Sequence, residues 1–267
     1  MDYGVRLITP VVTMAALGLF FGVGLAYVLK IFGVKVDPEV ALIITKLPGT
    51  NCGACGKAGC TAFAEALKKG EAVPSDCVVS GDESRKLVAQ ILGIDYNSKV
   101  KTIATLLCNG GRRAKDKYFY NGIRSCKAAS LVFNGQKACA FGCLGFGDCV
   151  DDCPFGAIIM GEDGLPAVDA AKCTSCGKCV KACPKRLFEI TPAEKHYYVK
   201  CSSREPGAVV MKVCSAGCIG CRKCEKACPS AAVKIEDNLA KIDYGKCQNM
   251  GKCFEVCPTK VVRLRNQ

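Results

Sequence analysis

The stretch that decides the fold is "CTSCGKCVKACP", residues 173–184. Its cysteines follow the spacing C-x2-C-x2-C-x3-C-P, and "CIGCRKCEKACP" at residues 218–229 repeats it. This spacing is typical of bacterial ferredoxins, in which three cysteines of a run hold one four-iron cluster and the fourth serves the neighbouring cluster. Zinc does not usually need four cysteines packed so closely before a proline. The two runs therefore predict iron–sulfur clusters, bound by Cys173, Cys176, Cys179, Cys183, Cys218, Cys221, Cys224 and Cys228.

Two further runs each lack their second cysteine. "CLGFGDCVDDCP" at residues 143–154 has Phe146 in that place, and "CQNMGKCFEVCP" at residues 247–258 has Met250. Cysteines also recur at a period of 75 residues, and short hydrophobic, strand-like stretches follow each C-P. The sequence thus predicts two tandem two-cluster ferredoxin-like units, at residues 136–195 and 196–267. The recurring cysteines are Cys126, Cys139, Cys143, Cys149 and Cys153, which return as Cys201, Cys214, Cys218, Cys224 and Cys228.

Exchange of ligands between neighbouring runs predicts which cysteines share a cluster. The complete sets are Cys153, Cys173, Cys176 and Cys179 in the first unit, and Cys218, Cys221, Cys224 and Cys257 in the second. The set Cys143, Cys149 and Cys183 is one ligand short, and Cys139 is its nearest supplier, ahead of Cys126 and Cys108. The set Cys228, Cys247 and Cys253 is also short. This set either borrows Cys201 or Cys214 as its fourth ligand or holds a three-iron cluster. Cys214 is the less suitable donor, because it precedes the complete run at residues 218–229 and not the short one.

A smaller module, residues 36–100, precedes these units. "NCGACGKAGC" at residues 51–60 is followed by one more cysteine, and its glycines let the backbone wrap closely around a bulky inorganic core. Four thiolates also suit zinc, but the density of glycine favours a four-iron cluster. Residues 61–69 predict a short helix with Phe63 and Leu67 on one face. The predicted ligands are Cys52, Cys55, Cys60 and Cys77.

Residues 1–35 predict a membrane anchor. Residues 7–29 carry no charge and are long enough to cross the hydrocarbon core. Lys30 and Lys35 follow this stretch, and basic residues favour the cytoplasmic side, where thiol ligands also persist best. We therefore expect a single-pass protein of the bacterial inner membrane with its soluble part in the cytoplasm. The spacing of Gly18 and Gly22 either packs against another membrane helix or is incidental.

The amino-acid composition favours iron–sulfur clusters over disulfide bonds as the role of the cysteines. The chain has 267 residues and 23 cysteines, an odd number at tight spacings with no cleavable signal peptide, which argues against a disulfide framework. The formal charge of +13 would suggest a nucleic-acid partner. Five oxidised four-iron clusters with their thiolates carry about −10 and would leave about +3. The case for nucleic acid therefore loses its main support.

The order of these motifs resembles the B subunit of the Rnf electron-transport complex. The likeness rests on the membrane helix, "NCGACGKAGC", "CAFGCLGFGDCVDDCPFGAI" and "CTSCGKCVKACP", and it covers essentially the whole chain. Residues past about 200 resemble a longer form with an added ferredoxin unit. The resemblance implies a membrane complex that passes electrons from reduced ferredoxin to NAD, coupled to sodium or proton transport. Flavin-bearing membrane subunits would be the partners, and the B subunit would accept the electrons.

The sequence shows no substrate chemistry of its own. No G-x-G-x-x-G follows a strand, and His196, the one histidine, is expected to be structural or at the surface. The segment at 101–135 predicts a basic linker, and its positive charge suggests a docking face for an acidic ferredoxin. A solvated face or a contact with a partner subunit would leave the same pattern. The alternatives for the whole chain are a stand-alone membrane polyferredoxin for another reductase and a zinc-stabilised scaffold.

Overall fold

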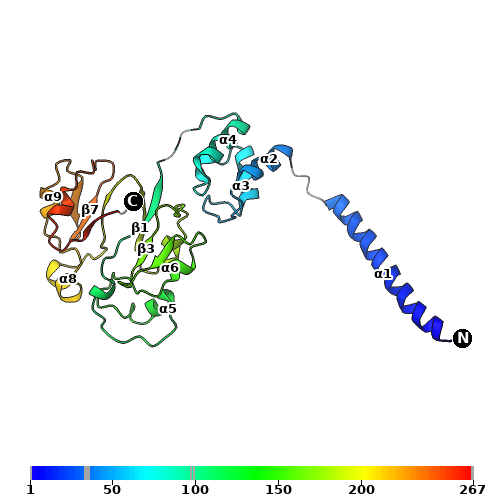
Figure 1. The fold of residues 1–267 in the computed structure, drawn as a ribbon, viewed down its shortest axis with the longest axis horizontal. Helices are drawn as coiled ribbons and strands as arrows, with labels where there is room; N and C mark the ends of the chain where they lie inside the picture. The colour runs from blue at the N-terminus through cyan, green and yellow to red at the C-terminus, as the bar shows by residue number, and fades with distance from the viewer. Residues whose placement is uncertain (1, 33–36, 97, 99, 266–267) are drawn as a thin grey trace.

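The computed structural model describes residues 2–32, 37–96, 98 and 100–265. Along the chain it places one long helix, a small helical module, and two units that combine short strands with short helices (Figure 1). This arrangement confirms the predicted α+β class with an N-terminal apolar helix. Lys35, used above to orient the membrane helix, and the predicted boundary between residues 35 and 36 lie outside the described residues.

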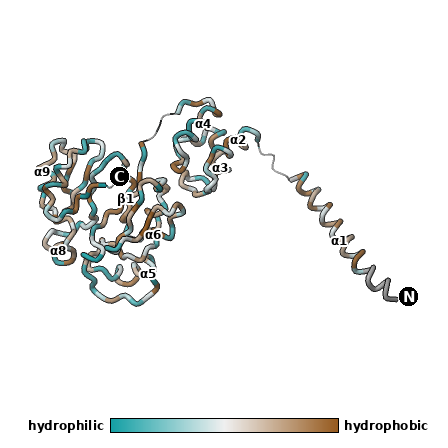
Figure 2. Tube along the Cα trace, viewed as in Figure 1, coloured by the Kyte–Doolittle hydropathy of each residue, from teal (hydrophilic) through white to brown (hydrophobic). Residues whose placement is uncertain are grey.

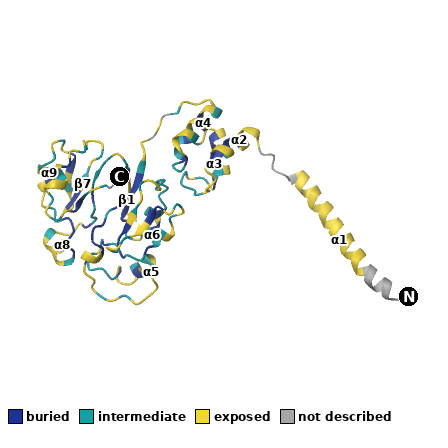
Figure 3. Ribbon diagram, in the orientation of Figure 1, coloured by how far each residue is buried: buried dark blue, intermediate teal, exposed yellow. Residues whose placement is uncertain are grey.

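Helix α1 (Asp2–Phe32) contains the predicted membrane span. The stretch Pro10–Ile31 has 22 residues and a mean hydropathy of 2.1, and none of it is buried against the rest of the chain (Figures 2 and 3). A helix of this length rises about 33 Å, enough for a hydrocarbon core of about 30 Å. Because a helix that is apolar on every side needs lipid or other apolar helices around it, α1 is suited to a membrane.

The helical module packs helices α2 (Pro38–Lys46), α3 (Cys60–Lys68) and α4 (Asp82–Leu92) together, with the 3-10 turn η1 (Pro74–Asp76) between α3 and α4. Its core is formed by Ile43, Phe63 and Val88, each at most 1% exposed. Burial of one such side chain stabilises the fold by about 1.5–3 kcal/mol. Helix α3 confirms the predicted helix, with Phe63 and Leu67 on its buried face.

The first ferredoxin unit is built on two antiparallel strand pairs. Strand β1 (Thr102–Leu106) pairs with β4 (Phe188–Pro192), and β2 (Ile158–Met160) pairs with β3 (Pro166–Val168). Helices α6 (Asp148–Asp151) and α7 (Lys178–Ala182) carry cysteines, while the 3-10 turn η2 (Gly111–Arg113) and α5 (Cys126–Leu131) lie between β1 and α6.

The segment predicted as a linker, residues 101–135, therefore belongs to this unit. Ile103, Ala104 and Leu106 of β1 are buried, and Ala104 and Leu106 join the core of the unit. Because β1 pairs with β4 and buries these side chains in the folded unit, it cannot act as a solvated connection. The first unit begins at its strand, ahead of the boundary expected at residue 136.

The second unit repeats this plan. Strand β5 (Tyr197–Val199) pairs with β8 (Val262–Leu264), and β6 (Val233–Glu236) pairs with β7 (Leu239–Ile242) across a tight turn. Asp237 and Asn238 both have positive φ in that turn, the conformation that hairpins of this length favour. Helices α8 (Gly207–Val213), α9 (Lys223–Lys226) and α10 (Lys252–Glu255) complete the unit. The strands predicted after each C-P are confirmed as β2, β4, β6 and β8.

Polar contacts join the two units. Arg265, just after β8, donates to the hydroxyls of Thr105 and Thr191 at 2.8 and 2.6 Å, and to the carbonyl of Pro192 at 2.7 Å. The Ser202 hydroxyl donates to the carbonyl of Leu107 at 2.8 Å. Hydrogen bonds to a charged group contribute about 1.5–3 kcal/mol each. The protein chain itself thus holds the units against each other.

Candidate metal centres

The helical module surrounds a small cavity with four thiols. Two details of the loop explain the glycines between them. Gly53 and Gly59 have φ of 70° and 141°, which side-chain-bearing residues rarely adopt. A Cβ on Gly59 would also lie 2.9 Å from Asn51 Oδ1, which accepts the amide of Cys60 at 2.7 Å. The loop therefore folds around the predicted set, Cys52, Cys55, Cys60 and Cys77, all of which line the cavity.

The complete set of the first ferredoxin unit comes together as the run predicts. Cys179, on α7, is buried, and its pKa is raised to about 12, chiefly by burial and then by the other three sulfurs of the set. A thiol of this kind ionises only when a cation compensates it, and a bound metal provides that compensation. The amide of Ala104 on β1 points to Cys173 Sγ at 3.5 Å. The set is Cys153, Cys173, Cys176 and Cys179.

The set that lacks its second cysteine because of Phe146 gains a fourth thiol from Cys126. Cys126, Cys143, Cys149 and Cys183 line one small cavity. Phe146 packs against Tyr120, with ring centroids 5.4 Å apart, so the aromatic ring rests on the segment that carries Cys126. Sequence reasoning assigns Cys139 to this set. The structure corrects that assignment, because Cys139 lines a different cavity.

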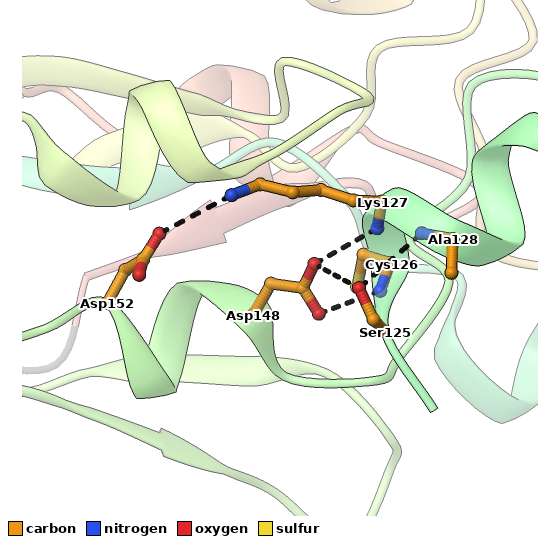
Figure 4. A network of polar contacts seen from close by, with 6 residues as sticks. All are labelled: Ser125, Cys126, Lys127, Ala128, Asp148 and Asp152. Atoms are coloured by element: carbon orange, nitrogen blue, oxygen red, sulfur yellow. Dashed lines mark hydrogen bonds and ion pairs between the residues drawn. The ribbon is translucent and has the colours of Figure 1, made fainter. Parts of the chain in front are cut away.

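Asp148 explains how Cys126 reaches this position (Figure 4). Its carboxylate accepts the amides of Cys126 and Lys127 at 2.7 and 3.0 Å, and the hydroxyl of Ser125 at 2.9 Å. Burial raises the pKa of Asp148, but these hydrogen bonds outweigh it and leave the pKa below its usual value. Ser125 also accepts the amide of Ala128 as the N-cap of α5. Asp148 thus fixes the start of α5 next to Cys149, its neighbour on α6.

The complete set of the second unit is also brought together. Cys224, on α9, has a pKa raised to about 12, first by burial and then by the other three sulfurs. The amide of Val261 points to Cys257 Sγ at 3.3 Å. Cys221 is the one exposed cysteine among the 23, all of which lie in the described part of the chain, so one edge of this set reaches the surface while Cys218 and Cys224 are buried. The set is Cys218, Cys221, Cys224 and Cys257.

The set that lacks its second cysteine because of Met250 is not completed in the same way. Cys253 has its pKa raised by burial and by the nearby Cys228 and Cys247. Met250 is 53% exposed. The expected loan of Cys201 or Cys214 is not what the structure shows, because both line a cavity with cysteines of the first unit. The sulfur of Cys201 is held there by the amide of Cys218, at 3.3 Å.

Four cysteines that the sequence left unassigned or misassigned share that last cavity. They are Cys108, Cys139, Cys201 and Cys214. Two signals in the sequence could have found them. Cys139 and Cys214 each lie four residues before a ferredoxin run, and Cys108 and Cys201 each lie two residues after a strand that opens a unit.

Within the described residues, no three or more His, Cys, Asp or Glu side chains are arranged to hold one metal ion. A zinc ion would draw its sulfurs to about 2.3 Å, whereas an iron–sulfur cluster needs its ligands spread around a larger space. His196 has no part in any set. Its amide donates to Asn249 and its carbonyl accepts from Arg265, so its backbone has a structural role.

Family models match the same segments. A model described as "Putative Fe-S cluster" matches residues 47–79. Two further models are both described as "4Fe-4S dicluster domain". One matches residues 137–188, and the other matches residues 172–232 and again residues 217–261. The fold and the cysteine sets thus define an iron–sulfur, electron-transport protein built on dicluster ferredoxin units behind one apolar helix.

The chain belongs to the family of B subunits of Rnf complexes, the ion-translocating ferredoxin:NAD oxidoreductases. It is 44% identical to the B subunit of the Na(+)-translocating ferredoxin:NAD(+) oxidoreductase complex of Acetobacterium woodii, over 96% of this chain and 77% of that protein. It is 41% identical to the B subunit of the ion-translocating oxidoreductase complex of Methanosarcina acetivorans, over 97% and 98%. It is 42% identical to the B subunit of the proton-translocating ferredoxin:NAD(+) oxidoreductase complex of Clostridium ljungdahlii, over 94% and 90%. The resemblance noted in the sequence is confirmed.

Proposed function

We propose that this chain accepts electrons from reduced ferredoxin and relays them into an ion-translocating ferredoxin:NAD oxidoreductase complex. Helix α1 would anchor it in the bacterial inner membrane, with the soluble part on the cytoplasmic side. The observation that carries the proposal is the grouping of cysteines into separate sets linked by short helical segments. This chain binds the clusters and shields them from solvent. Flavin-bearing partner subunits carry out the reduction of NAD.

Within each ferredoxin unit, one short helical segment carries cysteines of both sets. Cys149 and Cys153 lie one turn apart on and just after α6, and they belong to different sets of the first unit. Cys224 and Cys228 do the same at α9 in the second unit. A bound cluster supplies one-electron oxidation and reduction at a potential tuned by hydrogen bonds to its sulfurs and by burial. The short helices therefore fix neighbouring redox centres at a constant separation.

We infer the ligands of this relay from the way in which the cysteines are grouped. Four sets provide four thiolates each, and the set with Met250 provides three, which suits a three-iron cluster. We assign Cys52, Cys55, Cys60 and Cys77; Cys153, Cys173, Cys176 and Cys179; Cys126, Cys143, Cys149 and Cys183; Cys218, Cys221, Cys224 and Cys257; and Cys228, Cys247 and Cys253.

The segment before α6 has the character of a ferredoxin docking surface. Arg112, Lys115 and Arg124 are exposed on it, together with Phe119 at 90% and Phe133 at 82% exposure. An acidic ferredoxin would meet positive charge around a few apolar contacts, a combination that speeds encounter and sets orientation. Because α5 carries Cys126 in the same segment, electrons would enter at the set that contains Cys126.

The test is anaerobic rapid mixing of the solubilised full chain with a reduced two-cluster ferredoxin. We expect the visible absorption of the chain to bleach at a rate that falls as salt is added. Reversal of Arg112 and Lys115 to Glu should lower this rate about tenfold at low ionic strength, through lost steering. The exposed pair Lys172 and Lys246, reversed in the same way, serves as the control. No bleaching would contradict the function, and equal rates would place docking elsewhere.

A further inference from the structure

We propose that Cys108, Cys139, Cys201 and Cys214 hold a sixth iron–sulfur cluster at the junction of the two ferredoxin units. The inference rests on the proposed iron–sulfur relay and extends it. These four residues line one cavity, two from each unit. Two other cavities in the described part of the chain are likewise lined by four cysteines each.

The two units contribute the same contacts to the cavity, which argues for a built site. Cys108 Sγ accepts the amides of Gly110 and Cys143, both at 3.4 Å. Cys201 Sγ accepts the amides of Ser203 and Cys218, at 3.5 and 3.3 Å. In each unit, therefore, the sulfur that follows the first strand receives an amide two residues on and the amide of the first cysteine in a run. Amide donors of this kind are typical of thiolates that ligate clusters.

Contacts between the units place Cys214, and a local turn places Cys139. Ala114 and Cys214 form an isolated antiparallel bridge, and the amide of Lys115 donates to the carbonyl of Val213 at 2.8 Å. Cys139 is set by a turn in which the amide of Gly142 donates to its carbonyl at 3.0 Å. The chain thus brings all four thiols together across the unit boundary.

The residues that line the cavity leave space between its sulfurs and include one hydrogen-bond donor without a partner in the described part of the chain. A Cβ on Gly110 would lie 3.0 Å from the Cβ of Ala114 and within 3.7 Å of the sulfurs of Cys108 and Cys214, so it would fill the space between them. Asn109, 3% exposed, also lines the cavity. Its oxygen accepts from Arg113 at 2.9 Å, but its buried Nδ2 has no partner in the described part of the chain. An inorganic sulfide would give that donor an acceptor.

The number of cysteines that remain unassigned agrees with this site. The five sets assigned above leave four cysteines over, and this cavity takes all four, so each of the 23 cysteines belongs to one set. A cluster here would also lie between the units. Cys139 and Cys214 each lie four residues before the first cysteine of a neighbouring set, Cys143 in one unit and Cys218 in the other. It would continue the electron path from one unit into the other.

The test is iron, sulfide and zinc per chain in the full-length protein purified anaerobically. Cys108→Ser and Cys201→Ser should each lose about four iron atoms. Their double variant should lose the same four, because both thiols serve one site. Cys108→Ser combined with Cys126→Ser should lose about eight. Ser203→Ala, which alters the cavity wall without removing a thiol, is the matched control and should keep all the iron.

Wild-type protein gives a second readout that needs no variant. With this site the chain should hold about 23 or 24 iron atoms, depending on the cluster at the set with Met250, and without it about 19 or 20. The lower count, unchanged iron in both single variants, or loss of one zinc ion in place of iron would each overturn the sixth cluster. Bleaching of the other centres by reduced ferredoxin would still occur in those cases. Failure of this inference is thus distinct from failure of the relay.

Discussion

A chain that carries Cys126→Ser should bind about four fewer iron atoms than wild type, and adding Phe146→Cys should restore them. The reason is that Cys126 provides the fourth thiol at a set whose own run has Phe146 in the second ligand position. A cysteine at 146 restores the spacing C-x2-C-x2-C-x3-C and makes the distant thiol unnecessary. Iron and acid-labile sulfide per chain, measured after anaerobic purification, give the result.

Two controls separate this explanation from general damage. Phe146→Leu in the Cys126→Ser background fills the same position without a thiol and should restore nothing. Phe146→Cys should also fail to rescue Cys139→Ser, because Cys139 belongs to another cavity. If Cys126→Ser retained all its iron, the assignment made from the structure would be wrong. If Phe146→Cys rescued Cys139→Ser, the assignment made from the sequence would be right.

Met250→Cys should convert a three-iron cluster into a four-iron cluster. The set at Cys228, Cys247 and Cys253 lacks a fourth thiol, and Met250 occupies the ligand position in its run. Since Met250 is 53% exposed, a smaller side chain there disturbs no packed core. The variant should gain about one iron atom. It should also lose the low-temperature paramagnetic signal of the oxidised protein, because an oxidised three-iron cluster has an unpaired spin and an oxidised four-iron cluster has none.

Met250→Leu is the control, since it keeps an apolar side chain without a thiolate and should keep the signal. An oxidised wild-type protein that lacks such a signal but has the full iron content would show that a four-iron cluster already occupies this set. Its fourth ligand would then be something other than cysteine. Asn249, whose Oδ1 lies 4.0 Å from Cys247 Sγ, would be the first residue to replace.

The spacing of the cysteines along the sequence predicted those sets whose members lie in ferredoxin runs or in the four-cysteine module. The two complete ferredoxin sets and the four-cysteine module are assembled as the sequence indicates, because their ligands are fixed by tight loops and one helical turn. The helix at Cys60–Lys68 and the strands after each C-P were predicted for the same reason. In these segments the hydrophobic pattern and the turn residues agree with the final packing.

Ligands supplied from a distance could not be found in this way. Cys126 reaches its set because Asp148 holds the start of α5, a contact that no spacing reveals. The period of 75 residues also misled, since it aligned Cys126 with Cys201. The structural counterpart of Cys201 is Cys108, as each follows the strand that opens its unit, β5 and β1. The segment with η2 and α5 lengthens the first unit and shifts the alignment.

Whether the thiols of this chain hold iron–sulfur clusters can be decided by the content of iron, acid-labile sulfide and zinc in the full-length protein prepared without oxygen. We expect a brown protein with about 23 iron and about 24 sulfide per chain, and essentially no zinc. A colourless protein that contains zinc at these sets and no acid-labile sulfide would contradict the assignment.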